Sequence, residues 1–182
     1  AESMPTISKD GKTYVFKIRK GVYFHPDPVF NGKKRELTAD DFVFSFKRFL
    51  DPKLRSQWKF LFDGKIAGLN QLAERADQSG KFDYDAPVEG LRALDRYTLQ
   101  IKLTAPDFNL AYILAMPSTI AVAREVVEAY RDDVGAHPVG TGAYMLKTYE
   151  RGRRIVECMQ HATRLRRSQR GPVRSGRSSS PS

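Results

Sequence analysis

Apolar and polar residues alternate near the start of the chain, and this alternation predicts a half-buried strand. Tyr14, Phe16 and Ile18 fall on one side of a period-two segment. Lys17 and Arg19 fall on the other side. Side chains of a strand point alternately to its two faces, so this pattern is typical of a sheet with one face in the core and one in solvent.

The next residues predict a turn and a second short strand. Gly21 after Lys20 suits the turn, because glycine reaches positive φ without steric cost. Residues 22–24 then continue as an extended segment. Pro26 and Pro28 end it, since proline donates no backbone hydrogen bond to a sheet.

A capped helix is expected after a short basic loop. Thr38 is a good N-cap, and Asp41 three residues later completes a capping-box pattern. Asp51-Pro52 ends the helix, because the residue before proline is pushed out of the α region. Apolar side chains recur at helical spacing and would pack one face into a core: Phe42, Phe46, and Phe49 or Leu50.

The middle of the chain predicts a β-hairpin and further helices. The hairpin would join residues 88–94 to residues 97–103 through a turn at Asp95-Arg96. The aromatic strip formed by Trp58, Phe60 and Phe62 is expected to pack in the core, with ligand stacking as the alternative. Helices are predicted over residues 68–78, from Pro106 through Leu114, and over residues 124–130.

Two blocks of this sequence resemble the family 5 extracellular solute-binding proteins of ABC importers, which bind oligopeptides and dipeptides. The first reads DGKTYVFKIRKGVYFH at residues 10–25, followed by LTADDFVFSFKRFLDP at residues 37–52. The second, HPVGTGAY at residues 137–144, is similar to the family's PVGTGPY turn, with Ala143 where the family has proline. The resemblance covers about residues 1–157.

The resemblance implies an α/β fold, namely one lobe of a bilobed periplasmic-binding-protein type II fold with a mixed sheet and flanking helices. The lobe is expected to be incomplete, because the chain resembles an internal fragment of a longer protein and shows no signal peptide. Gly140, Thr141, Gly142 and Tyr144 are the candidate site residues, expected to form a turn near the junction of the two lobes. The ligand-contacting residues stay unassigned.

The function that the resemblance implies is that of the substrate-binding component of an ABC transporter. Such a protein captures peptides, or a related small solute, and delivers them to permease subunits in the membrane. It is expected to be a monomer in the periplasm or another extracytoplasmic compartment. A lobe that serves only as a structural element, without a ligand of its own, is the alternative.

The net charge of +10 belongs mostly to the C-terminal part of the chain. Residues 1–150 carry 22 basic and 20 acidic side chains, whereas residues 151–182 carry nine arginines and one glutamate. The Arg/Ser-rich tail over residues 158–182 is expected to be disordered, since it lacks apolar periodicity. It is either a nucleic-acid-binding arm or the product of a reading-frame change near the codon for Glu157; the neutral body makes nucleic acid the less favoured partner.

The residues indicate no enzyme, no cofactor and no metal site. Adjacent carboxylates such as Asp40 and Asp41 point apart on a helix and do not form an acid/base pair. His25 and His137 precede prolines and have no Cys, His or Glu at ligand spacing. The turn at residues 140–142 lacks the GK[ST] continuation of a phosphate loop. Three further candidates lack a glycine elbow and a base: Ser45, Ser118 and Cys158.

Overall fold

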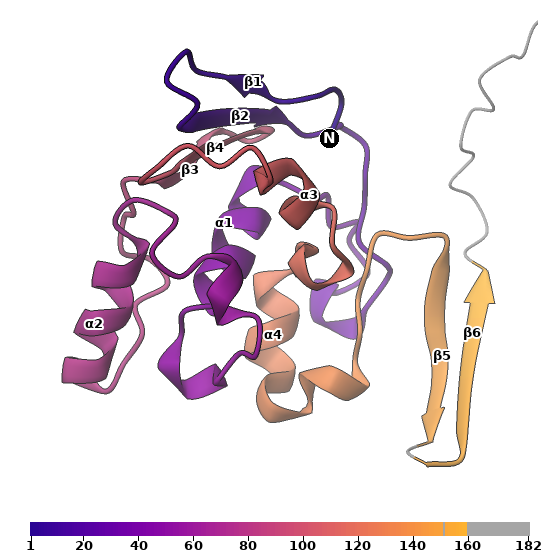
Figure 1. Ribbon diagram of the computed structural model, residues 1–182. Coiled ribbons are helices and arrows are strands. Elements are labelled where there is room, and N and C mark those ends of the chain that lie inside the picture. Colours follow the sequence, from indigo (N-terminus) through magenta and orange to yellow (C-terminus); the bar gives the residue numbers. More distant parts are fainter. Residues whose placement is uncertain (151, 160–182) are drawn as a thin grey trace, which may run out of the picture.

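The computed structural model describes residues 1–150 and 152–159, which form a mixed α/β body with a hairpin beside it (Figure 1). A four-stranded antiparallel sheet has the order β1-β2-β4-β3. Its strands are β1 (Thr6–Ile7), β2 (Thr13–Lys17), β3 (Leu91–Asp95) and β4 (Thr98–Lys102). The helices are α1 (Ala39–Arg48), α2 (Leu69–Ser79), α3 (Leu110–Leu114) and α4 (Arg124–Tyr130). Short 3-10 turns lie at Pro28–Phe30, Pro52–Leu54, Lys59–Leu61, Pro117–Thr119 and Arg131–Ala136.

The sheet joins the first motif to the predicted hairpin. Tyr14 of β2 lies opposite Ile101 of β4, and Phe16 lies opposite Leu99. Tyr14, Ile101 and Leu99 are buried, so one face of the sheet covers the core. The predicted alternating strand and the predicted hairpin are confirmed, and cross-strand pairs of this kind stabilise a sheet.

Helix α1 runs through the centre of the core and is buried on more than the predicted face. Phe46 stacks on Phe62 with ring centroids 5.1 Å apart, as expected of the predicted face. Phe44, which lies outside that face, is also buried and packs on Tyr84 at 5.0 Å. The helix therefore separates two packed layers instead of covering one.

Lys47 of α1 is buried and fixes the segment that precedes the hairpin. Its Nζ donates hydrogen bonds of 2.8 Å to the carbonyls of Tyr84 and Ala86. Burial lowers the pKa of Lys47, because it disfavours the charged form. The Tyr84 hydroxyl donates to Asp51 at 2.6 Å, which anchors the same segment to the end of α1.

An ion-pair network joins the start of α1 to α4. Asp41 is 2% exposed, and its carboxylate accepts bonds from the Thr38 backbone N–H at 2.7 Å and hydroxyl at 3.0 Å. Arg35 binds the same carboxylate through two nitrogens, at 2.7 and 3.1 Å. Arg35 Nε also donates to Glu125 of α4 at 2.8 Å. The predicted capping pair is confirmed. Asp41 has Arg35 as a second partner, and Arg35 links it to Glu125, which is 90 residues further along the chain than Arg35.

Gly90 lies where three backbone segments meet at the end of the sheet. Its N–H donates to Ala67 O and its carbonyl accepts from Lys102 N, both at 2.8 Å. A Cβ at this position would lie 2.5 Å from Lys102 O and 2.6 Å from Ala67 N. Only glycine allows the backbones to approach so closely.

The second hairpin consists of β5 (Tyr144–Glu150) and β6 (Arg154–Met159) and stands beside the body (Figure 1). β6 continues to Met159, so Cys158 and Met159 belong to a strand, in contrast to the disorder expected from residue 158 onward. Residues 160–182 of the predicted tail lie outside the described residues.

Three local predictions need correction. Residues 22–24 form no strand but a single bridge between Tyr23 and Glu36. The helix expected to open at Pro106 begins at Leu110, because residues 104–109 form bends and a turn before it. In the aromatic strip Phe62 is buried and Trp58 packs against the core, but Phe60 is 63% exposed.

Gly90→Ala should lower the free energy of unfolding by about 2–3 kcal/mol, because the new methyl group meets backbone atoms that cannot move aside cheaply. Gly135→Ala is the matched control, since its Cβ would meet nothing within 4 Å. The control should change the free energy by less than about 1 kcal/mol. Urea unfolding of both variants measures the difference, and equal stabilities would contradict the close approach at Gly90.

Glu125 should contribute to the acid sensitivity of the fold. Partial burial is the largest single influence and would raise its pKa, but the hydrogen bonds from Arg35 and from the Glu125 backbone, together with the charges of Arg35 and Arg124, outweigh it and hold the pKa below its usual value. A lowered folded-state pKa means stability that is present above about pH 4.3 and lost as the pH falls through the folded-state pKa.

Glu125→Gln should therefore destabilise the chain near neutral pH, and the deficit should shrink below about pH 4.3. Denaturant unfolding at a series of pH values measures this difference. Glu74→Gln is the control, since Glu74 is exposed on α2 and makes no salt bridge within residues 1–150 and 152–159. A deficit for Glu125→Gln that stays constant with pH would refute the contribution.

Candidate functional site

His25, at the end of the first motif, holds the glycine-rich turn of the second motif. Its backbone N–H donates to Gly140 O at 2.8 Å, and its Nε2 lies 2.8 Å from Gly142 O. Gly140 N–H points to His25 Nδ1 at 3.4 Å. A carbonyl oxygen only accepts, so Nε2 carries the proton and Nδ1 is the acceptor. This neutral ring, which is 4% exposed, binds the turn on both of its nitrogens.

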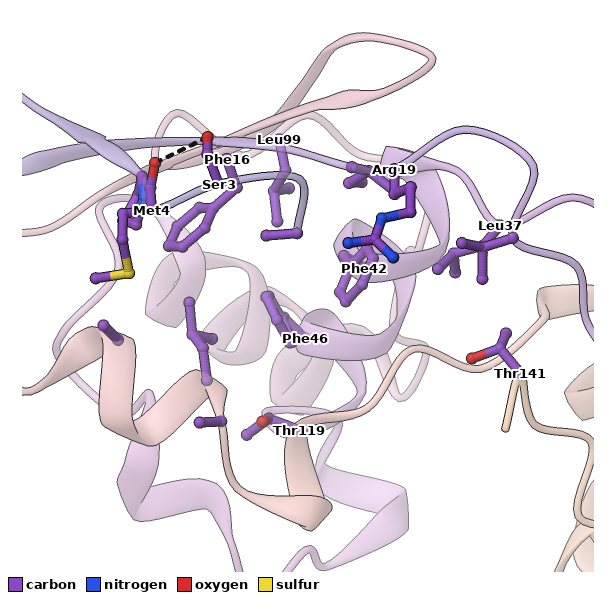
Figure 2. A pocket seen from close by; sticks show the side chains of 17 residues that line it. Ser3, Met4, Phe16, Arg19, Leu37, Phe42, Phe46, Leu99, Thr119 and Thr141 are labelled. Atoms are coloured by element: carbon purple, nitrogen blue, oxygen red, sulfur yellow. Dashed lines mark hydrogen bonds between the residues drawn. The ribbon is translucent and has the colours of Figure 1, made fainter. Parts of the chain in front are cut away.

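An apolar pocket of about 520 Å³ opens beside this turn (Figure 2). The sheet supplies its upper wall through Phe16 and Leu99, and α1 supplies Phe42 and Phe46 from below. α3 and the turn after it close another side. The remaining lining residues are Ala1, Ser3, Met4, Pro5, Ile18, Arg19, Val22, Leu37, Ala111, Leu114, Ala115, Thr119 and Thr141.

A few polar groups stand among these apolar side chains. Arg19 reaches from the sheet side toward Phe42, and its guanidinium makes no salt bridge within the part of the chain that the structure describes (Figure 2). Thr119 adds a hydroxyl group below Phe46, and Thr141 adds one on the side of Leu37 (Figure 2). An apolar cavity with a small number of placed polar groups is typical of small-molecule sites.

The structure brings three of the four predicted site residues together. Gly140 and Gly142 are engaged by His25, and Thr141 between them lines the apolar pocket. Tyr144 lies apart at the start of β5 and is 57% exposed. The assignment of these residues to a turn between two lobes stays a prediction.

The segment that leads into the turn is fixed by stacked rings. His137 lies parallel to Tyr130, with ring centroids 3.9 Å apart and an interplanar angle of 2°. The Tyr130 hydroxyl donates to Asp27 at 3.1 Å. Desolvation and this hydrogen bond raise the pKa of Tyr130. His137 Nε2 lies 3.2 Å from Asp133 on the preceding turn. The sequence showed the histidine but not its aromatic partner.

The described residues hold no group of three or more His, Cys, Asp or Glu side chains that could bind a metal ion. None of the helices in the described part is long and apolar enough to cross a membrane. The sequence pattern did not reveal the role of Arg19 or the walls of the pocket, because periodicity identifies apolar faces but not a gap between them.

Comparison with known proteins agrees with the arrangement of these motifs. The family model for bacterial extracellular solute-binding proteins, family 5 Middle, matches residues 1–157. The dipeptide-binding protein of Escherichia coli K12 is 31% identical over 159 residues, which cover 82% of this chain and 26% of that protein. The periplasmic oligopeptide-binding protein OppA of the same strain is 32% identical over 155 residues, covering 82% of this chain and 25% of OppA.

A solved structure shows the same likeness in three dimensions. DppA, a periplasmic binding protein of Helicobacter pylori associated with an ABC transporter and bound to the peptide STSA, superimposes with a TM-score of 0.63 at 25% identity. The match covers 86% of this chain and 29% of DppA. The chain thus spans about a quarter of the length of the curated relatives it matches. By the family match over residues 1–157, the chain belongs to the bacterial extracellular solute-binding proteins of family 5.

Proposed function

We propose that this chain is part of the substrate-binding component of an ABC importer, which captures peptides and delivers them to membrane permease subunits. The observation that carries the proposal is the match to peptide-binding proteins over about four fifths of the chain. Relatives named for binding support a role without catalysis. The proposal places the protein in the periplasm or an equivalent extracytoplasmic space, as a monomer.

The apolar pocket is the part of the chain that would bind the peptide. Its volume of about 520 Å³ accommodates one or two large side chains of a peptide. Arg19 at the wall offers a cation for a peptide carboxylate, and Thr141 offers a hydroxyl group. We assign the pocket to an apolar peptide side chain near a carboxylate.

The alternatives have less support. None of the relatives reported above is named for nucleic-acid binding, and residues 160–182, which motivated that interpretation, lie outside the described residues. A lobe without its own ligand would leave the pocket without a role. Residues 140–144 form the proposed junction between lobes, and His25 would hold the junction on the side of the body.

Apolar di- to pentapeptides should raise the melting temperature of the chain. Ligand at a hundred times its dissociation constant stabilises by about 2.7 kcal/mol, which corresponds to a shift of roughly 5–10 °C for a chain of this size. Ala115→Phe fills the pocket from an exposed lining position and should abolish the shift.

Ala129→Phe is the matched control, because Ala129 is exposed on α4 and lies away from the pocket. It should keep the full peptide-dependent shift. Equal peptide-dependent shifts of the melting temperature in both variants would show that the peptide does not bind in this pocket. If no peptide raises the melting temperature, the peptide assignment is wrong. Another solute, such as a sugar, an opine or a metal chelate, would then be favoured.

His25→Ala should loosen the turn at residues 140–142, because it removes both ring contacts with Gly140 and Gly142. Amide hydrogen exchange over residues 138–143 should become at least about tenfold faster, which corresponds to roughly 1.4 kcal/mol of local stability. Exchange in α2, remote from the ring, serves as the internal control. Unchanged protection at the turn would show that backbone bonds alone hold it.

A further inference from the structure

We propose that an aromatic patch, formed by Phe108 and Tyr112, is a contact site for the surface of an anionic lipid bilayer. Phe108 directly precedes the N-cap of α3, and Tyr112 lies in the first turn of this helix. The turn that joins β1 to β2 lies beside the patch. Neither residue lines the apolar pocket assigned above to a peptide, so the proposal goes beyond the proposed function.

The two rings are the most exposed aromatic side chains of the described residues. Phe108 and Tyr112 are each 77% exposed. Among the other aromatic residues of the ranges 1–150 and 152–159, the highest exposed fraction is 63%, at Phe60. Asn109 has helical φ and ψ, and residues four apart on a helix are neighbours, so the two rings lie next to each other. They form one patch, whereas single exposed apolar residues are normal on a protein surface.

The backbone beneath the patch is held in place by the sheet and the core. The Tyr14 hydroxyl donates to Asp107 O at 3.0 Å. Leu110 of α3 is buried, with 1% of its surface exposed. A Cβ at Gly11 would lie 3.9 Å from Phe108 Cζ, so the turn between β1 and β2 packs against the ring. Contact with a membrane would therefore order few further groups and lose little conformational entropy.

Lysine side chains flank the patch. Lys9 and Lys12 belong to the turn between β1 and β2. Lys65 Nζ lies 3.2 Å from the carboxylate of Asp107, the residue before Phe108. With Asp10 of the same turn, three lysines stand against two aspartates, and the local charge is +1. Lysine stems can lie along apolar surface while their ammonium groups reach lipid phosphates, so this surrounding suits an anionic bilayer.

The shape of the patch favours lipid over a protein partner. Neither ring lines any of the five cavities of about 390 to 550 Å³ on the described residues. A protruding ring needs a matching cavity in a protein partner, whereas acyl chains rearrange around it. Tyrosine is also enriched at membrane–water interfaces, because its ring is apolar and its hydroxyl group is polar. We therefore assign the patch to a lipid surface.

The contact would be reversible and would not anchor the protein. Two partly inserted aromatic rings bury no more apolar surface than one acyl chain, and one acyl chain alone binds membranes only marginally. Such a contact would hold the protein close to the bilayer, in which the permease subunits of the proposed importer lie. It does not require an occupied peptide pocket, so its failure would leave the proposed function unaffected.

Tryptophan reporters at two matched positions test the contact. Phe108→Trp and the control Phe60→Trp are each combined with Trp58→Phe, so that each chain has one tryptophan, at an exposed aromatic position. The probes are vesicles of phosphatidylcholine and phosphatidylglycerol in equal parts, with and without brominated acyl chains, which quench a tryptophan that reaches the acyl region. The six arginines of residues 160–182 can also attract the chain to these vesicles. The two reporters are therefore compared at vesicle concentrations that sediment the same fraction of protein.

The proposal expects brominated lipid to cause a loss of emission in the Phe108→Trp chain and little or none in the Phe60→Trp chain. Adding Tyr112→Ser should weaken vesicle binding of the Phe108→Trp chain about fivefold, because it removes one of the two rings. Equal quenching at both positions, or none at position 108, would overturn the proposal. Full quenching with pure phosphatidylcholine vesicles would overturn the assignment to anionic lipid. Dimers that Tyr112→Ser abolishes, without quenching by lipid, would assign the patch to a second copy of the chain instead.

Discussion

The buried carboxylate of Asp41 constrains the rest of the body. A charged side chain that is only 2% exposed must be paired. The Asp41 carboxylate accepts hydrogen bonds from Thr38 and makes a bidentate contact with Arg35. Removing one partner of such a pair costs about 3–5 kcal/mol, although the pair itself adds little net stability. Its effect is therefore to select one arrangement: α1 begins at Ala39 after its N-cap Thr38, Arg35 lies over that start, and Glu125 brings α4 to the same place.

Local signals predicted the elements that depend on neighbours in the sequence. The capping pair at Thr38 and Asp41 located α1, and apolar periodicity located α4 at the observed bounds. The short strand at residues 22–24 failed, because a strand also needs a partner and residues 22–24 make only one bridge. The helix expected from Pro106 through Leu114 is present, but it begins only at Leu110, because proline permits a first helical turn but does not require one.

Contacts between distant residues could not be predicted from one sequence. Arg35 and Glu125 are 90 residues apart, and His25 lies more than a hundred residues before Gly140. Nothing in the local pattern marks Gly90 as the place where three backbones meet. For the candidate site, the resemblance identified the turn at residues 140–142. The apolar pocket beside it depends on how the sheet, α1 and α3 pack, and periodicity does not describe that packing.

The apolar pocket shares one wall with a second groove, which lies between the end of α1 and the segments 54–58 and 118–122. Thr119 faces the pocket, while its neighbours Ser118 and Ile120 line the groove. On α1, Phe46 faces the pocket and Ser45 faces the groove. Because side chains of adjacent residues leave a backbone in different directions, a wall of one layer can present different chemistry on its two sides. The bond from Val122 N–H to the Ser45 hydroxyl, at 2.9 Å, holds the two segments of this wall together.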